Sequence, residues 1–104
     1  MPFHREKFEH LIKELAMEFL AREINRTSLV TVTGLRVENN EHDVVILYTV
    51  LPVDQEKPVF DFLMRKRAAF REFVKSKARL RAIPTFDFAL DRGEKNRQKM
   101  EEIV

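Results

Sequence analysis

The sequence contains no cysteine and only two glycines. Without cysteine the chain cannot form disulfides, thiolate metal sites or a thiol nucleophile, and nothing in it indicates an oxidising compartment. Gly34 and Gly93 alone cannot build the glycine-rich loops that hold phosphates in P-loop and dinucleotide-binding proteins. We therefore expect a cytoplasmic protein that binds no nucleotide cofactor.

Long uncharged runs are also absent from the chain. The longest, residues 44–53, is far shorter than the roughly 20 apolar residues that a membrane helix requires. The first residues carry charges of both signs, and Lys13 and Glu14 interrupt the apolar segment that a secretory signal needs. We expect no membrane span and no targeting segment.

Catalytic and metal-binding patterns are equally scarce. Three histidines occur, none of them spaced to bind a metal on one helix face: His4, His10 and His42. Ser28 and Ser76 have no nucleophile motif around them. Asp87 and Asp91 are predicted on a strand and in a turn, which does not favour a catalytic carboxylate pair. We expect no metal, no cofactor, no small-molecule substrate and no enzymatic activity.

The apolar content is sufficient for one folded domain. The sequence is 44% hydrophobic and 35% charged, too apolar for a disordered chain and too charged for a membrane protein. A chain of 104 residues has room for one core. We expect a single domain over residues 1–93, followed by a tail over residues 94–104 that is a short helix or disordered.

Charge is distributed unevenly along the chain. Residues 65–81 contain eight basic residues and one acid, a net charge of +7, whereas the rest of the chain has a net charge of −5. The basic residues of this segment are Arg65, Lys66, Arg67, Arg71, Lys75, Lys77, Arg79 and Arg81. Such a segment is typical of a surface that contacts a polyanion, above all RNA. The alternatives are a solvated helix face and a module that docks an acidic protein partner.

Hydrophobic periodicity predicts a helix followed by a β-hairpin. Apolar residues recur every three or four positions over residues 8–24, which indicates an amphipathic helix. Residues 29–38 are rich in Val and Thr, and their apolar positions change parity at Gly34, which predicts a β-bulge there. After a turn at residues 39–41, residues 42–51 form a second strand, whose unbroken apolar run predicts burial over much of both faces.

A broken helix follows the hairpin. Asp54 is the predicted N-cap of this helix. One straight helix would bury Lys66 and Arg67 on the same side as its apolar residues, so we expect a break within residues 66–69. The second part ends near Lys77 or Ala78.

The last predicted strand covers residues 85–90, after Pro84, and residues 91–93 form a turn. Five phenylalanines fall on positions that face the core: Phe19, Phe70, Phe73, Phe86 and Phe88. Phe60 and Phe62 cannot both face that core from one helix.

The order helix, strand, strand, helix, break, helix, strand is that of a KH-type RNA-binding domain of the second topological class. The residues that carry a closer resemblance are Leu11, Glu14, Leu15, Ala16, Leu20, Arg22, Glu23 and Ile24, then residues 29–33, Phe70, Arg71, residues 79–84, Phe86, Phe88 and Asp91. In this order and spacing they resemble the ribosome-binding factor A family. The resemblance implies an α+β, KH-like (type II) domain whose three-stranded sheet has its helices packed on one face.

Two departures from the family pattern concern backbone geometry. Where the family has an Ala-x-Gly kink, this chain reads Lys66, Arg67, Ala68, with no glycine. Because alanine enters the left-handed region at a cost, we expect the kink to form differently. Residues 25–28 form a shorter turn without the family's proline.

The resemblance also implies a function. It is that of a cytoplasmic monomer that binds the 30S small ribosomal subunit and its 16S rRNA, near the RNA's 5′ region, during late maturation. Ribosome biogenesis, rRNA processing and adaptation to cold follow from the same resemblance.

The residues themselves suggest how RNA would be held. Lysine and arginine neutralise phosphates, and we expect Arg71 and Lys75, one helical turn apart, to share an exposed face. Lys77, Arg79 and Arg81 extend this surface, the last two with their side chains on the same side of an extended segment.

Overall fold

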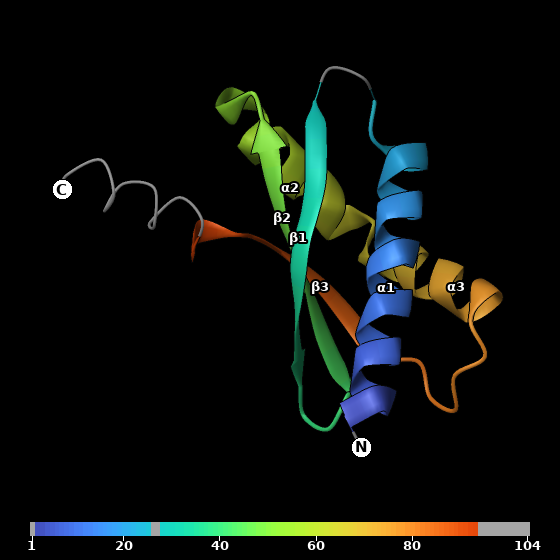
Figure 1. Cartoon of the computed structure of the whole chain (residues 1–104). Coiled ribbons are helices and arrows are strands. Elements are labelled where there is room, and N and C mark those ends of the chain that lie inside the picture. Colours follow the sequence, from blue (N-terminus) through green and yellow to red (C-terminus); the bar gives the residue numbers. More distant parts are fainter. Residues whose placement is uncertain (1, 26–27, 94–104) are drawn as a thin grey trace, which may run out of the picture.

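Three helices cover one face of a three-stranded sheet in the computed structural model, which describes residues 2–25 and 28–93 (Figure 1). The elements in chain order are α1 (Pro2–Glu23), β1 (Leu29–Glu38), β2 (Asp43–Leu51), a 3-10 turn (Val53–Gln55), α2 (Glu56–Arg65), α3 (Arg67–Lys77) and β3 (Thr85–Leu90). This is the predicted order, including the two helices between the second and third strands. The predicted tail, residues 94–104, lies outside the described residues.

The sheet has the strand order β1-β2-β3, with β2 antiparallel to β1 and parallel to β3. The hairpin contains the predicted bulge. Val32 pairs with Tyr48 and Gly34 pairs with Leu47, so Thr33, one residue before the predicted position, is the extra residue. Because β2 and β3 are parallel, the chain between them must cross the sheet, and α2 and α3 form this crossover.

The turn between β1 and β2 is confirmed, and its backbone is left-handed. Asn39, Asn40 and Glu41 have φ angles of 52°, 53° and 69°. Asparagine tolerates this region better than most residues, which explains why two of them stand here. The His42 amide closes the turn on the Asn39 carbonyl at 3.0 Å, and the His42 carbonyl accepts a hydrogen bond from the Thr85 amide at 2.9 Å. The turn therefore holds the first residue of β3.

The second face of β2 is more open than predicted. Four side chains on its helix-covered face are buried: Val44, Ile46, Tyr48 and Val50. Val45 and Leu47, on the other face, are only half-buried. The prediction of burial over much of both faces is wrong, because in the described part of the chain the helices cover one face alone (Figure 1).

The break between α2 and α3 occurs at one residue, Lys66, as predicted. Lys66 has φ −99° and ψ 3°. Its amide donates to the Leu63 carbonyl at 3.0 Å, and its carbonyl accepts from the Phe70 amide at 2.9 Å. Because a negative φ is accessible to lysine, the break requires no glycine. It lets Leu63 of α2 and both Phe70 and Val74 of α3 face one core.

Two predicted boundaries are wrong. Asp54 does not cap α2, because it lies within the 3-10 turn, and Gln55 then precedes α2 without a side-chain cap. Arg92 and Gly93 have a helical conformation where a turn was predicted, and the Asp91 carboxylate accepts the Gly93 amide at 3.1 Å. Both errors concern where a helix begins and leave the strands unchanged.

The core is built around Phe70. Its ring centroid lies 5.2 Å from that of Phe19, 4.8 Å from that of Phe86 and 5.6 Å from that of Phe88. These distances are in the range of favourable aromatic pairs. Phe73, also predicted in the core, is half-buried, with its centroid 5.5 Å from that of Phe19. The core prediction is therefore confirmed for four of the five rings and only in part for Phe73.

Aromatic side chains outside this cluster differ in exposure. Phe62 is partly buried whereas Phe60 is 38% exposed, as their spacing on one helix requires.

The Tyr48 hydroxyl is buried and has no hydrogen-bond partner among the described residues. Burial, helped by the Glu56 carboxylate, raises the pKa of Tyr48 to about 12. The phenol therefore stays neutral at physiological pH.

Candidate nucleic-acid interface

The eight basic residues predicted to contact RNA fall into two groups. Four are held by other groups of the protein: Lys66, Arg67, Arg71 and Lys77. Four are exposed and form no hydrogen bond or ion pair with the described residues: Arg65, Lys75, Arg79 and Arg81. The free energy that a cation contributes to binding a phosphate depends on what it must first release, so the two groups are not equivalent.

The two cations at the helix break face acidic residues from distant parts of the chain. The Lys66 ammonium lies 3.8 Å from a carboxylate oxygen of Glu23, and 5.4 Å from the centre of the Phe62 ring. The Arg67 guanidinium lies 3.6 Å from the Asp87 carboxylate and also donates to the Met64 carbonyl at 3.1 Å. The break is therefore positively charged on its surface but partly neutralised.

Arg71 does not share an exposed face with Lys75, so this prediction is wrong. Arg71 is half-buried, and its Nε and Nη2 atoms donate at 3.2 Å each to the carbonyls of Pro84 and Ile83. Lys75 is exposed. The reason is tertiary: the segment before β3 returns along one side of α3 and meets Arg71, which helical spacing alone does not reveal. Arg71 positions this segment rather than offering a free charge.

Lys77 and Arg22 lie near the same aromatic ring, that of Phe73, and Arg22 was not among the predicted contacts to RNA. The Lys77 ammonium lies 4.0 Å from a Glu18 oxygen and 5.7 Å from the Phe73 ring centre. The Arg22 guanidinium lies 5.5 Å from the same ring. Arg22 therefore belongs to the cationic surface between α1 and α3. A basic residue in the last turn of α1 was the only signal for it.

Arg79 and Arg81 are exposed on either side of the half-buried Leu80, which confirms the predicted alternation. They border a concavity of about 330 Å³ that we call the arginine hollow. It is lined by Phe8 of α1, by the turn residues Asn40, Glu41 and His42, and by residues 79–82. His42 is the second residue that sequence reasoning missed, because only the fold brings the turn beside the loop.

Arg65 lies apart from this hollow. It borders a smaller concavity of about 210 Å³, between α2 and the end of α1, together with Glu23 and Phe62. None of the residues that line this concavity also lines the arginine hollow. The structure therefore does not bring Arg65 together with Arg79 and Arg81.

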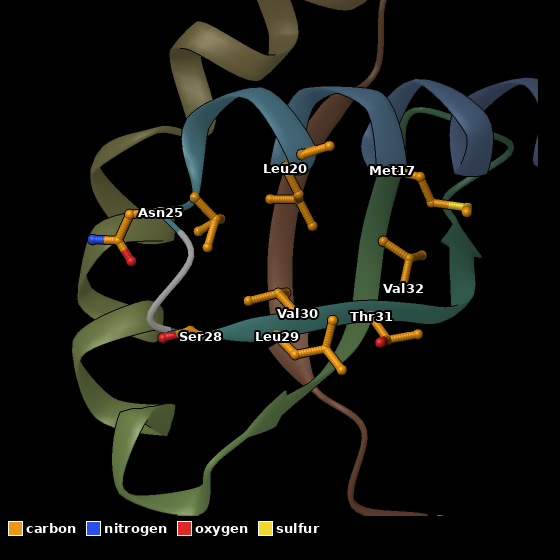
Figure 2. Close-up of a pocket in the computed structure, with 10 residues that line it drawn as sticks. Met17, Leu20, Asn25, Ser28, Leu29, Val30, Thr31 and Val32 are labelled. Carbon is orange, nitrogen blue, oxygen red and sulfur yellow. The ribbon is translucent and has the colours of Figure 1, made fainter.

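A larger groove, of about 510 Å³, runs between α1 and β1 (Figure 2). Figure 2 shows Met17 and Leu20 of α1 opposite Val30 and Val32 of β1. Leu29, which also lines the groove, is 63% exposed. None of the described residues that line it is charged, so we do not include the groove in the candidate interface.

No group of three or more His, Asp or Glu side chains among the described residues is arranged to hold a metal ion. No helix in that part of the chain combines the length and apolar composition needed to cross a membrane. The described residues that line the arginine hollow offer two cations, a carboxylate, an amide and an imidazole ring.

Comparison with known proteins gives a consistent answer. The family model described as Ribosome-binding factor A matches residues 4–104. Ribosome-binding factor A of Thermobifida fusca is 31% identical over 101 residues, which cover 94% of this chain and 67% of that protein. Ribosome-binding factor A of Geotalea daltonii is 28% identical over 102 residues, covering 95% of this chain and 83% of that protein.

The fold is similar to a solved structure as well. The crystal structure of ribosome-binding factor A from Thermus thermophilus superposes with a TM-score of 0.69 and 22% identity. The superposition covers 82% of this chain and 92% of that one. The predicted α+β, KH-like fold with a three-stranded sheet is thereby confirmed.

Proposed function

Because this chain belongs to the ribosome-binding factor A family, we propose that it binds the 30S small ribosomal subunit through 16S rRNA and assists its late maturation and rRNA processing. The proposal includes a cytoplasmic location, a monomeric state and a contribution to growth in the cold. It includes no catalytic step. The chain acts by selecting one conformation of the RNA with a folded surface.

One observation carries the proposal. Lys75, Arg79 and Arg81 are exposed cations without partners among the described residues, and they follow one another on α3 and the segment after it. The rest of the chain outside residues 65–81 has a net charge of −5. A polyanion would therefore be attracted to this side and repelled by the others, which favours one orientation on RNA.

The test is binding of the purified protein to mature small subunits, large subunits and free RNA across a salt series. Arg79→Glu with Arg81→Glu removes the proposed contacts. Arg36→Glu with Lys57→Glu is the matched control, because it changes the net charge equally at two surface ion pairs outside the basic segment.

We expect the wild-type protein to prefer the small subunit. The variant with Arg79→Glu and Arg81→Glu should lose this preference, and the control variant should retain it. Equal binding to all RNAs would leave only a generic cationic protein. Absence of RNA binding at every salt concentration would overturn the proposal and leave the alternative, docking of an acidic protein partner on the same segment.

A further inference from the structure

The arginine hollow combines two kinds of surface that a nucleotide requires. Arg79 and Arg81 line it, and both are exposed and unpaired among the described residues. Phe8, which is 7% exposed, and the half-buried Leu80 contribute apolar atoms to its lining, and Asn40 and His42 contribute polar side chains. A lining that combines cations with apolar atoms suits a phosphate joined to a flat, partly apolar base.

The volume of the hollow limits what can enter it. About 330 Å³ lies near the lower end of the range, about 300–1,000 Å³, that small-molecule sites occupy. A double helix cannot enter such a space, whereas one base turned out of its stack can. The likeness is to recognition of single-stranded RNA, in which unstacked bases pack on side chains and present their edges for hydrogen bonds.

Hydrogen bonds anchor both the loop and the turn that line the hollow. Arg71 fixes the loop by donating at 3.2 Å to the carbonyls of Ile83 and Pro84. Thr85 ties the start of β3 to the turn through the His42 carbonyl, 2.9 Å from the Thr85 amide. A site whose walls are fixed before binding loses less conformational entropy when the ligand arrives.

Glu41 is the one acid among the described residues that line the hollow, and its negative charge is compensated by a neighbouring cation. The Glu41 carboxylate accepts a hydrogen bond from the Arg5 guanidinium at 3.2 Å, so its charge is compensated from α1. The net charge of the lining is therefore set by Arg79 and Arg81. Phosphate binding is favoured at this point of the surface.

The geometry points to a nucleotide site: the arginine hollow takes one unpaired nucleotide of an RNA strand, its phosphate on Arg79 and Arg81 and its base against Phe8 and Leu80. This inference deepens the proposed function and rests on it for the source of the RNA. It assigns base contact to His42 and Asn40, which lie outside the basic segment.

The first experiment uses AMP, GMP, CMP and UMP as probes of the full chain by NMR. We expect amide shifts at Asn40, His42, Leu80 and Ala82 with at least one of the four. Adenosine and inorganic phosphate at the same concentration separate the two halves of the site. Shifts as large with inorganic phosphate as with every nucleotide would overturn the inference, because the base would then add nothing.

The second experiment narrows the hollow without changing charge. Ala82→Leu enlarges a side chain that lines it, and Ala21→Leu makes the same change at an exposed position on α1 outside it. For an unstructured RNA dodecamer we expect the dissociation constant to rise about tenfold in the first variant and less than about twofold in the second. Thermal unfolding checks that both variants are folded, and equal affinities in folded variants would overturn the inference.

The outcomes separate this inference from the proposed function. If wild type binds small subunits while no nucleotide shifts the hollow residues, the inference is wrong and the proposed function stands. If nucleotides bind the hollow but small subunits do not bind the protein, the nucleotide site stands and its ribosomal source is wrong.

Discussion

The break between α2 and α3 and the loop before β3 each carry two closely spaced cations, but their surroundings differ. At the break, Lys66 lies 3.8 Å from Glu23, and Arg67 lies 3.6 Å from Asp87. In the loop, Arg79 and Arg81 are exposed and unpaired among the described residues. The two pairs of cations look alike in the sequence, but only the pair at the break is partly neutralised by neighbouring carboxylates.

The comparison teaches where an incoming phosphate finds attraction without competition. A phosphate at the break must displace a carboxylate or share a cation with it, and part of the Coulombic gain is lost. A phosphate at the loop meets cations that have no acidic partner among the described residues. We therefore expect the loop to contribute more of the affinity for RNA than the break, although the break stands where the family kink would be.

The largest expected effect is a loss of stability on substitution of Arg71, which holds the loop in place. Arg71→Ala removes two hydrogen bonds from a charged donor to the Ile83 and Pro84 carbonyls, and we expect a loss of about 3 kcal/mol in the free energy of unfolding. Lys75→Ala, on the same helix, should change it by less than about 0.5 kcal/mol. Urea unfolding measures both, and equal small losses would mean that the loop does not depend on Arg71.

The next effect compares the two regions directly. Arg79→Gln with Arg81→Gln should weaken RNA binding about tenfold and reduce the slope of log affinity against log salt by about 1.4, the value for two contacts to a single strand. Lys66→Gln with Arg67→Gln should weaken binding about twofold, because these cations are already paired. A titration at several salt concentrations checks this, and a steeper loss in the second variant would reverse the comparison.

Much of the fold could be predicted from the sequence, because local patterns determine it. Alternation predicted β3, and the parity change located the bulge to within one residue of Thr33. Two conflicting charges placed the break within residues 66–69, and it lies at Lys66. Asp54 failed as a helix cap because a 3-10 turn intervenes, and such a turn has no distinct signature in the sequence.

The site could be predicted only in part, because partners and free charges are decided by tertiary contacts. Glu23 and Lys66 are 43 residues apart, and no periodicity relates them. Helical spacing predicted that Arg71 is exposed, but the segment before β3 packs against it and accepts its hydrogen bonds. His42 lines the arginine hollow because the fold brings the hairpin turn beside the loop, and no local pattern in the sequence indicates this.

A smaller effect should appear when the break is made to resemble the loop. Glu23→Gln with Asp87→Asn removes the two acids that face Lys66 and Arg67, and it leaves every cation in place. We expect RNA affinity to rise about threefold as the freed cations become available and net charge increases. Glu6→Gln with Glu9→Gln removes two acids of α1, outside the basic segment, and controls for net charge alone. A rise of the same size in the control would show that pairing at the break has no effect.

The smallest effect concerns the glycine that the family has near the kink. Ala68 occupies that place, within the first turn of α3, and the break is made at Lys66 with a negative φ. Ala68→Gly therefore adds backbone freedom where a helix must form, and should lower the free energy of unfolding by about 0.5 kcal/mol. RNA affinity should stay unchanged, because neither the loop nor the arginine hollow depends on Ala68. A gain in affinity, measured by the same titrations, would instead place RNA against the kink and make the break the principal contact.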